Sequence, residues 1–101
     1  MHNIAYKDIC LAQVEALLAE PSTRIIDVRE PWEFEEFNIG GINIPLAEIR
    51  RKRDLLTDYT TLIVVCTNGV RSKVAAKDYC RIPEWNSKKI YHLKGGILEA
   101  E

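Results

Sequence analysis

Residues 62–65 are the segment that most constrains the fold, because they form an unbroken apolar run, Leu-Ile-Val-Val, that leads directly into Cys66. Three of these four residues are β-branched, which is typical of a strand covered on both faces of a parallel sheet. Apolar residues recur at helical spacing from Ala75 to Ile82, and Pro83 ends that pattern. The sequence therefore predicts a central buried strand, a short loop that begins at Cys66, and a helix.

Segments on either side repeat this alternation of strand and helix. Further strands are predicted at residues 25–28, 42–44 and 90–93, where apolar residues cluster. Helices are predicted over residues 11–18 and from Pro31 and Pro45, because proline is favoured in the first turn of a helix. Strands that alternate with helices indicate an α/β fold with a parallel sheet, and such sheets bind ligands at the carboxyl ends of their strands.

Length and composition set broad limits on function. Because the chain has 101 residues, 47% of them apolar, we expect residues 1–101 to fold as one domain around one core. The net charge of −1 argues against general binding to nucleic acid. No apolar run approaches the roughly 18 residues of a membrane helix, and Met1-His2-Asn3 does not begin a signal peptide. We therefore expect no membrane partner and a cytoplasmic location.

The three cysteines, Cys10, Cys66 and Cys80, are too widely spaced for a paired zinc motif, since the chain contains no Cys-x-x-Cys. We expect no metal site and no cofactor. A cytoplasmic chain keeps its thiols reduced, so each cysteine is judged by its surroundings. Cys80 falls on the inner face of the helix after the loop, and Cys10 lies at the start of the first helix. For both we favour a packing role.

Residues 66–72, Cys-Thr-Asn-Gly-Val-Arg-Ser, join the strongest strand to the helix that follows it. A loop that turns from a strand into a helix N-terminus directs several backbone N–H groups at one point, and Gly69 permits the backbone angles that this turn requires. Such a nest and the helix dipole together stabilise an anion, here the thiolate of Cys66. The alternative is a core thiol, which is common for an isolated cysteine. The combination of strand, loop and helix favours the reactive thiol.

Four segments in the right order make the sequence resemble the rhodanese family over nearly its whole length. They are Ile25 to Phe34, which contains Asp-Val-Arg-Glu, then Gly41 to Leu46, the Cys-x-x-Gly-x-Arg-Ser loop of residues 66–72, and the closing Gly95-Gly96-Ile97-Leu98. The resemblance implies a five-stranded parallel sheet flanked by helices, and a Cys66 that accepts sulfur and holds it as a persulfide, Cys–S–SH. It also implies that the backbone amides of residues 67–71 hold the outer sulfur, and that Asp27 and Arg29 lie near the active loop.

The predicted site therefore consists of one nucleophile, its loop and two supporting residues. It comprises Cys66, the loop residues Thr67, Asn68, Gly69, Val70, Arg71 and Ser72, and the supporting residues Asp27 and Arg29. Two roles stay open for Arg71: attraction of an anionic donor such as thiosulfate, or an ion pair with a nearby carboxylate that holds the loop. His92 ends a strand and could approach the loop, but for it we favour a structural role.

Other positions depart from the family or call for a structural interpretation. Asn38 stands where many members have histidine, and we expect it to be structural. The closing motif lacks the usual tryptophan, since Leu98 is followed by Glu99-Ala100-Glu101. Residues 81–88 replace a simpler glycine turn and could form a surface particular to this chain. The remaining expectation is that three aromatic side chains lie in the core: Trp32, Phe34 and Phe37.

Three functions are compatible with such a site. In the first, a thiosulfate sulfurtransferase, Cys66 takes the outer sulfur from thiosulfate or from a protein persulfide and passes it to a thiophilic acceptor, in two covalent steps. The second is a sulfur-carrier module that docks to a partner, since similar domains are fused to adenylyltransferases that sulfurate small carrier proteins. The third is a phosphatase. It is disfavoured because phosphatases on this scaffold place five residues between cysteine and arginine, and this loop has four. The sulfurtransferase is the function we predict.

Overall fold

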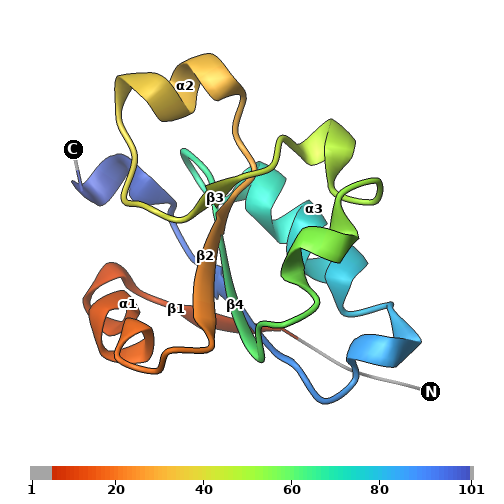
Figure 1. The fold of residues 1–101 in the computed structure, drawn as a ribbon. Coiled ribbons are helices and arrows are strands. Elements are labelled where there is room, and N and C mark those ends of the chain that lie inside the picture. Colours follow the sequence, from red (N-terminus) through yellow and green to blue (C-terminus); the bar gives the residue numbers. More distant parts are fainter. Residues whose placement is uncertain (1–5, 101) are drawn as a thin grey trace.

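Five parallel strands form one sheet in the computed structural model, which describes residues 6–100 (Figure 1). Their order across the sheet is β1 (Lys7–Ile9), β5 (Lys89–Leu93), β4 (Thr61–Val65), β2 (Thr23–Asp27) and β3 (Ile42–Asn43). The apolar run predicted as the central strand is β4, which lies in the middle of the sheet with all its residues buried. The expected five-stranded parallel sheet is therefore confirmed, and β4 places Cys66 at its carboxyl edge.

Helices cover both faces of the sheet, and one helix lies beyond the carboxyl ends of its strands (Figure 1). The α-helices are α1 (Leu11–Leu18), α2 (Pro31–Glu36) and α3 (Val70–Tyr79), and the 3₁₀ helices are η1 (Leu46–Glu48), η2 (Arg53–Leu56), η3 (Pro83–Trp85) and η4 (Ile97–Ala100). Figure 1 shows α1 and α3 on opposite sides of the strands, with α2 beyond their carboxyl ends. No helix within residues 6–100 has the length and apolar character needed to cross a membrane.

The unbroken apolar sequence of β4 is explained by two separate cores, one on each face of the sheet. Successive side chains of a strand point to opposite faces. Leu62 and Val64 pack in the cluster that contains Ala75 and Tyr79 of α3. Ile63 and Val65 pack in the cluster on the other face, under α1 and η4. Burial on both faces therefore accounts for the four consecutive apolar residues that follow Thr61 in β4.

Three local expectations were incomplete or wrong. β1 was not apparent in the apolar pattern because it has three residues, pairs only with β5 and buries only Ile9. The segment after Pro45 forms only short 3₁₀ turns in place of a longer helix. Trp32 does not lie in the core, since 62% of its surface is exposed on the outer side of α2. Phe34 and Phe37 are half-buried, and Phe37 packs against the core cluster under α1 and η4, as expected.

Candidate functional site

Cys66 lies directly after β4, with its side chain buried under its own loop. The backbone N–H groups of Gly69 and Ser72 donate to its Sγ at 3.1 and 3.2 Å. The Ser72 hydroxyl lies 3.2 Å from the same sulfur, where it accepts from a thiol and can donate to a thiolate. The two amides and the hydroxyl therefore converge on this one sulfur atom.

Gly69 turns the loop into the first residue of α3. Its φ is +93°, in the left-handed region that glycine enters without strain. The Asn68 side chain accepts from the N–H of Val70 at 3.1 Å and so caps the loop from the outside. Within residues 6–100, the amides of Thr67, Asn68 and Arg71 have no hydrogen-bond partner. These amides are free to bind an atom that arrives beside Cys66.

Arg71 pairs with Glu33 of α2. Its Nη1 and Nη2 donate to the two carboxylate oxygens at 2.7 and 3.0 Å, and Nη2 also lies 3.3 Å from the Thr67 hydroxyl. The hydrogen bond from Arg71 lowers the pKa of Glu33 to about 2, and the same bond raises the pKa of Arg71. Of the two roles that stayed open for Arg71, the structure shows the ion pair with a nearby carboxylate, and this pair fastens the active loop to α2.

Asp27 and Arg29 form a buried ion pair beside the site. Arg29 Nε and Nη2 lie 3.0 Å from the two oxygens of Asp27, and Nη2 also donates to the carbonyl of Phe37. Asp27 is level with Val65 in the sheet, one residue before Cys66. No hydrogen bond joins either residue to Cys66 in the described part of the chain. The pair braces the turn after β2, next to the active loop but not within it.

His92 contacts the loop, although the sequence did not assign it to the site. Its Nε2 lies 3.0 Å from the carbonyl oxygen of Gly69, and its Nδ1 lies 2.9 Å from a carboxylate oxygen of Asp8. The imidazole, which is 3% exposed, thus bridges β1 and the active loop. The only sequence signal was its place at the carboxyl end of a predicted strand, and that place alone does not reveal the contact with Gly69.

The closing segment holds the other side of the loop through its backbone. The N–H of Ile97 donates to the carbonyl of Cys66 at 2.9 Å, and the N–H of Leu98 donates to that of Thr67 at 3.2 Å. Gly96 lies so close to Thr67 that a Cβ there would stand 2.2 Å from the Thr67 carbonyl oxygen. The nucleophile, its amides and these supports lie together at the carboxyl edge of the sheet.

Comparison with known proteins identifies this arrangement. The sequence pattern of the Rhodanese-like domain matches residues 11–100. The chain belongs to the rhodanese-like family. A rhodanese-related protein from Thermoplasma volcanium superposes with a TM-score of 0.74 at 28% identity, over 93% of this chain and 89% of that one.

Two Bacillus subtilis proteins are similar to this rhodanese-like domain in sequence. Protein YqhL is 38% identical over 75 residues, which cover 73% of this chain and 57% of YqhL. The candidate sulfur carrier protein YrkF is 35% identical over 82 residues, which cover 80% of this chain and 43% of YrkF. The chain therefore spans about half the length of these two relatives.

Asn38, which stands where many family members have histidine, has a local structural role in this rhodanese-like domain. Its amide nitrogen donates to the carbonyl of Phe34 at 2.8 Å, and its amide oxygen accepts from the N–H of Gly40 at 2.9 Å. It therefore closes the end of α2, as expected from the sequence.

The other two cysteines lie apart from the Cys66 loop. Cys80 packs at the margin of the α3 core, and burial raises the pKa of its thiol. Cys10 is exposed and precedes α1. No cluster of three or more His, Cys, Asp or Glu side chains in the described part of the chain could hold a metal ion.

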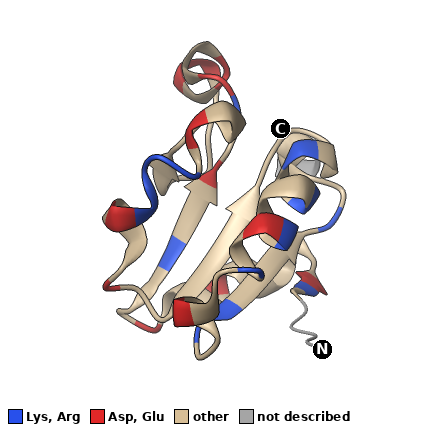
Figure 2. Cartoon of the chain, turned by 90° about the vertical axis from the view of Figure 1, so that its right-hand side faces the viewer, with Lys and Arg blue, Asp and Glu red and all other residues tan. Residues whose placement is uncertain are grey.

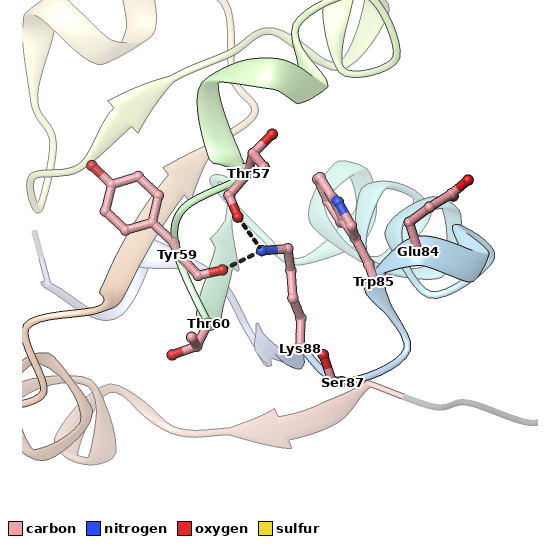
Figure 3. A pocket seen from close by; sticks show the side chains of 7 residues that line it. All are labelled: Thr57, Tyr59, Thr60, Glu84, Trp85, Ser87 and Lys88. Carbon is pink, nitrogen blue, oxygen red and sulfur yellow. Dashed lines mark hydrogen bonds between the residues drawn. The ribbon is translucent and has the colours of Figure 1, made fainter.

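The segment of residues 81–88 lines a hollow at the opposite edge of the sheet (Figure 3). Lys88 extends across it and donates to the carbonyl oxygens of Thr57, at 2.8 Å, and of Tyr59. Its ammonium also lies 5.1 Å from the ring centre of Trp85. Partial burial lowers the pKa of Lys88. The segment thus joins η3 to the loop before β4, at the amino ends of the strands and away from Cys66.

Proposed function

We propose that this domain is a sulfurtransferase that accepts sulfane sulfur as a persulfide on Cys66 and passes it to a thiophilic acceptor. The observation that supports this most directly is the convergence of two backbone amides and one hydroxyl on Sγ, at 3.1 to 3.2 Å. Cys66 is the proposed catalytic residue, residues 67–72 form the proposed substrate loop, and Asp27 and Arg29 support it. Residues 1–101 are proposed to act as one domain.

With thiosulfate as donor, the reaction is a displacement at the outer sulfur. The Cys66 thiolate attacks that sulfur and forms a new S–S bond, while the original S–S bond breaks and sulfite leaves with the electron pair. The terminal sulfur of the resulting persulfide bears the negative charge. The free amides of Thr67, Asn68 and Arg71 are suited to stabilise it. An acceptor thiolate or cyanide then attacks the terminal sulfur, and Cys66 leaves as the original thiolate.

The surroundings of Arg71 favour recognition of the donor by amides over recognition by a free cation. Both oxygens of Glu33 accept hydrogen bonds from its guanidinium, so the charge of Arg71 is already paired. The amides and the N-terminus of α3 supply the positive end of the site. A reducing compartment such as the cytoplasm suits this chemistry, because Cys10, Cys66 and Cys80 are all free thiols.

A sulfur-carrier role is the second candidate, supported by the 35% identity with a candidate sulfur carrier protein. In that role the donor or acceptor is a protein, for example an adenylyltransferase that activates a small carrier, and the Cys66 persulfide is unchanged. A phosphatase is not favoured. Two of the amides converge on one sulfur atom, and four residues between Cys66 and Arg71 leave a ring smaller than a phosphoryl group requires.

The test is incubation with thiosulfate in the absence of reductant, followed by intact mass measurement and peptide mapping. We expect about one added sulfur per chain, located on Cys66 and removed by cyanide or dithiothreitol. Cys66→Ser should abolish loading with the fold intact, whereas the matched control Cys80→Ser should load normally. Sulfur on Cys10 or Cys80, or no loading of the native chain, would show the assignment to be wrong.

A further inference from the structure

A groove with a volume of about 330 Å³ runs between η1 and α3, on the side of the molecule seen in Figure 2. Its apolar lining comes from Leu46, Ala47 and Ile49 on one wall and Val74 on the other. The charged residues that line it are Arg50, Arg81 and Asp78, and Asp78 is paired with Arg50. Val74 is 53% exposed, so the groove presents apolar surface to solvent.

The groove continues an exposed face of α3 that begins in the active loop. Val70 belongs to that loop, is 64% exposed, and lies one helical turn before Val74 on the same face. One turn of a helix advances about 5.4 Å. A chain that reaches the loop at Cys66 would therefore place its next few residues along Val70, Val74 and the groove.

The exposed charged residues on this face of α3 and at its end are basic. Lys73, Lys77 and Arg81 share the face with the two valines, at spacings of three or four residues, and all three are exposed. The single acidic residue between positions 70 and 81 is Asp78, which is buried and paired with Arg50 at 2.8 Å. The segment of residues 50–53 is also basic (Figure 2), although its side chains pair with Glu48 or Asp78. The whole molecule has a net charge of −1, so this positive surface is local.

We infer that the groove and the outer face of α3 dock an acidic, apolar segment of the protein that exchanges sulfur with Cys66. The inference rests on the proposed function, because it assigns the partner of that persulfide. The exposed side chains of Lys73, Lys77 and Arg81 attract carboxylates and raise the rate of encounter, while the valine and leucine side chains bury the apolar residues of the partner segment.

A protein fits this surface better than a small anion or a nucleic acid. Thiosulfate is a small anion that the active loop would hold, so an apolar groove outside that loop would not strengthen its binding. Single-stranded nucleic acid is typically bound by aromatic side chains that stack on bases, and none of the residues that line the groove is aromatic.

The experiment compares two synthetic acceptor peptides that each contain one cysteine, flanked by leucine and glutamate in one and by leucine and lysine in the other. Each is mixed at low salt with thiosulfate-loaded protein, and the rate at which sulfur moves from Cys66 to the peptide is followed by mass spectrometry. Free cysteine serves as the control acceptor, because it has no flanking residues that could contact the groove while it reacts at Cys66. We expect the glutamate peptide to react about tenfold faster than the lysine peptide, with equal rates at high salt.

Two substitutions test the surface, each with a matched control elsewhere. Arg81→Glu and Val74→Asp should each slow transfer to the glutamate peptide about tenfold and leave transfer to free cysteine unchanged. The controls are Lys7→Glu on the edge strand β1 and Leu18→Asp on α1, where Leu18 is 40% exposed on the other face of the sheet. Neither control should change any of the rates.

Binding of the same peptides, with cysteine replaced by serine and a fluorescent label added, tests the groove without persulfide chemistry. If Cys66 does not take up sulfur from thiosulfate, only the proposed function is refuted, because the fluorescence anisotropy of the labelled peptides still measures docking. Equal binding of both peptides, or binding unaffected by Arg81→Glu and Val74→Asp, would overturn the docking surface. Displacement of the glutamate peptide by bulk tRNA in an Arg81-dependent manner would assign the groove to nucleic acid and overturn it as well.

Discussion

The ion pair between Glu33 and Arg71 determines whether the active loop presents a free positive charge. Without Glu33, the guanidinium of Arg71 would stand free beside Cys66 and would act as a general attractant for anions. With both carboxylate oxygens bound, it becomes a brace between α2 and the loop. The residue type alone does not distinguish these roles, because arginine suits both.

The pKa of Glu33 leads to a prediction about acid stability. Its folded pKa of about 2 lies below the ordinary value of 4.5. The stabilisation is therefore fully present above pH 4.5 and is lost as the pH falls towards 2. We expect Glu33→Gln to reduce the free energy of unfolding by about 1 kcal/mol at neutral pH, and the difference from the native chain to shrink below pH 4.5.

Urea titrations at several pH values between 7 and 3 measure this effect. Glu35→Gln, an exposed change on the same helix, is the control and should show no such dependence on pH. A constant difference between Glu33→Gln and the native chain across this range would contradict the ion pair as its cause.

At the scale of elements, β5 holds the loop through His92. The contact of Nε2 with Gly69 matters because the same glycine donates its N–H to the sulfur of Cys66. We expect His92→Leu to remove one of the two hydrogen bonds to the Gly69 carbonyl, which also accepts from the N–H of Lys73, to reduce the free energy of unfolding by about 1 kcal/mol, and to slow sulfur loading. Asp8→Ala should have the same effect to a smaller degree, since Asp8 acts only through the ring.

Lys7→Ala is the matched control, because Lys7 lies on the same strand as Asp8 and is exposed. Loading rates with thiosulfate at fixed protein concentration, together with urea titrations, provide both measurements. Native loading by His92→Leu would show that β5 does not position the loop.

The elements that the sequence predicted well are those with a strong local pattern. β4, the loop and α3 are contiguous, and burial on both faces produces the apolar run from Leu62 to Val65 without long-range information. β1 could not be predicted from its pattern, because a three-residue edge strand with one buried side chain has no period to detect. Trp32 has an apolar side chain in a helical pattern, and the pattern does not tell which face of a six-residue helix is covered.

Residues of the candidate site likewise differ in whether a local sequence pattern could predict them. Cys66 and residues 67–72 follow one another in the chain, so the motif identifies them together. Glu33 and His92 lie 38 and 23 residues from the loop residues that they contact. Those contacts depend on the order of strands in the sheet, which a single sequence does not specify.

At the scale of the whole molecule, segments from both ends of the described chain support the same loop. β1 contributes Asp8, which reaches the loop through His92, and the closing segment contributes the backbone of Gly96 and Ile97. The active loop is therefore fixed by the assembled sheet and not by β4 and α3 alone.

Alanine substitutions at three glycines with positive φ separate two effects of the closing segment: its support of the active loop and its contribution to the stability of the fold. An alanine at Gly40, Gly41 or Gly96 is strained by the left-handed backbone in each case, by about 1–2 kcal/mol. At Gly40 nothing lies within 4 Å of the added Cβ, whereas at Gly41 the Ile25 carbonyl oxygen lies 2.3 Å away and at Gly96 the Thr67 carbonyl oxygen lies 2.2 Å away. We therefore expect melting temperatures to fall least for Gly40→Ala and further for Gly41→Ala and Gly96→Ala.

Sulfur loading should separate the two severe variants, because only Gly96 lies against the active loop. An alanine there must displace the backbone of Thr67 or Asn68, whose amides are proposed to bind the terminal sulfur. Loading is measured in the cold, at a temperature where circular dichroism shows both variants folded. Gly41→Ala should then load at the native rate and Gly96→Ala at least about tenfold more slowly, since a misplaced group at the reacting centre reduces rates by such factors. Equal loading by the two variants would mean that the closing segment stabilises the fold without shaping the site.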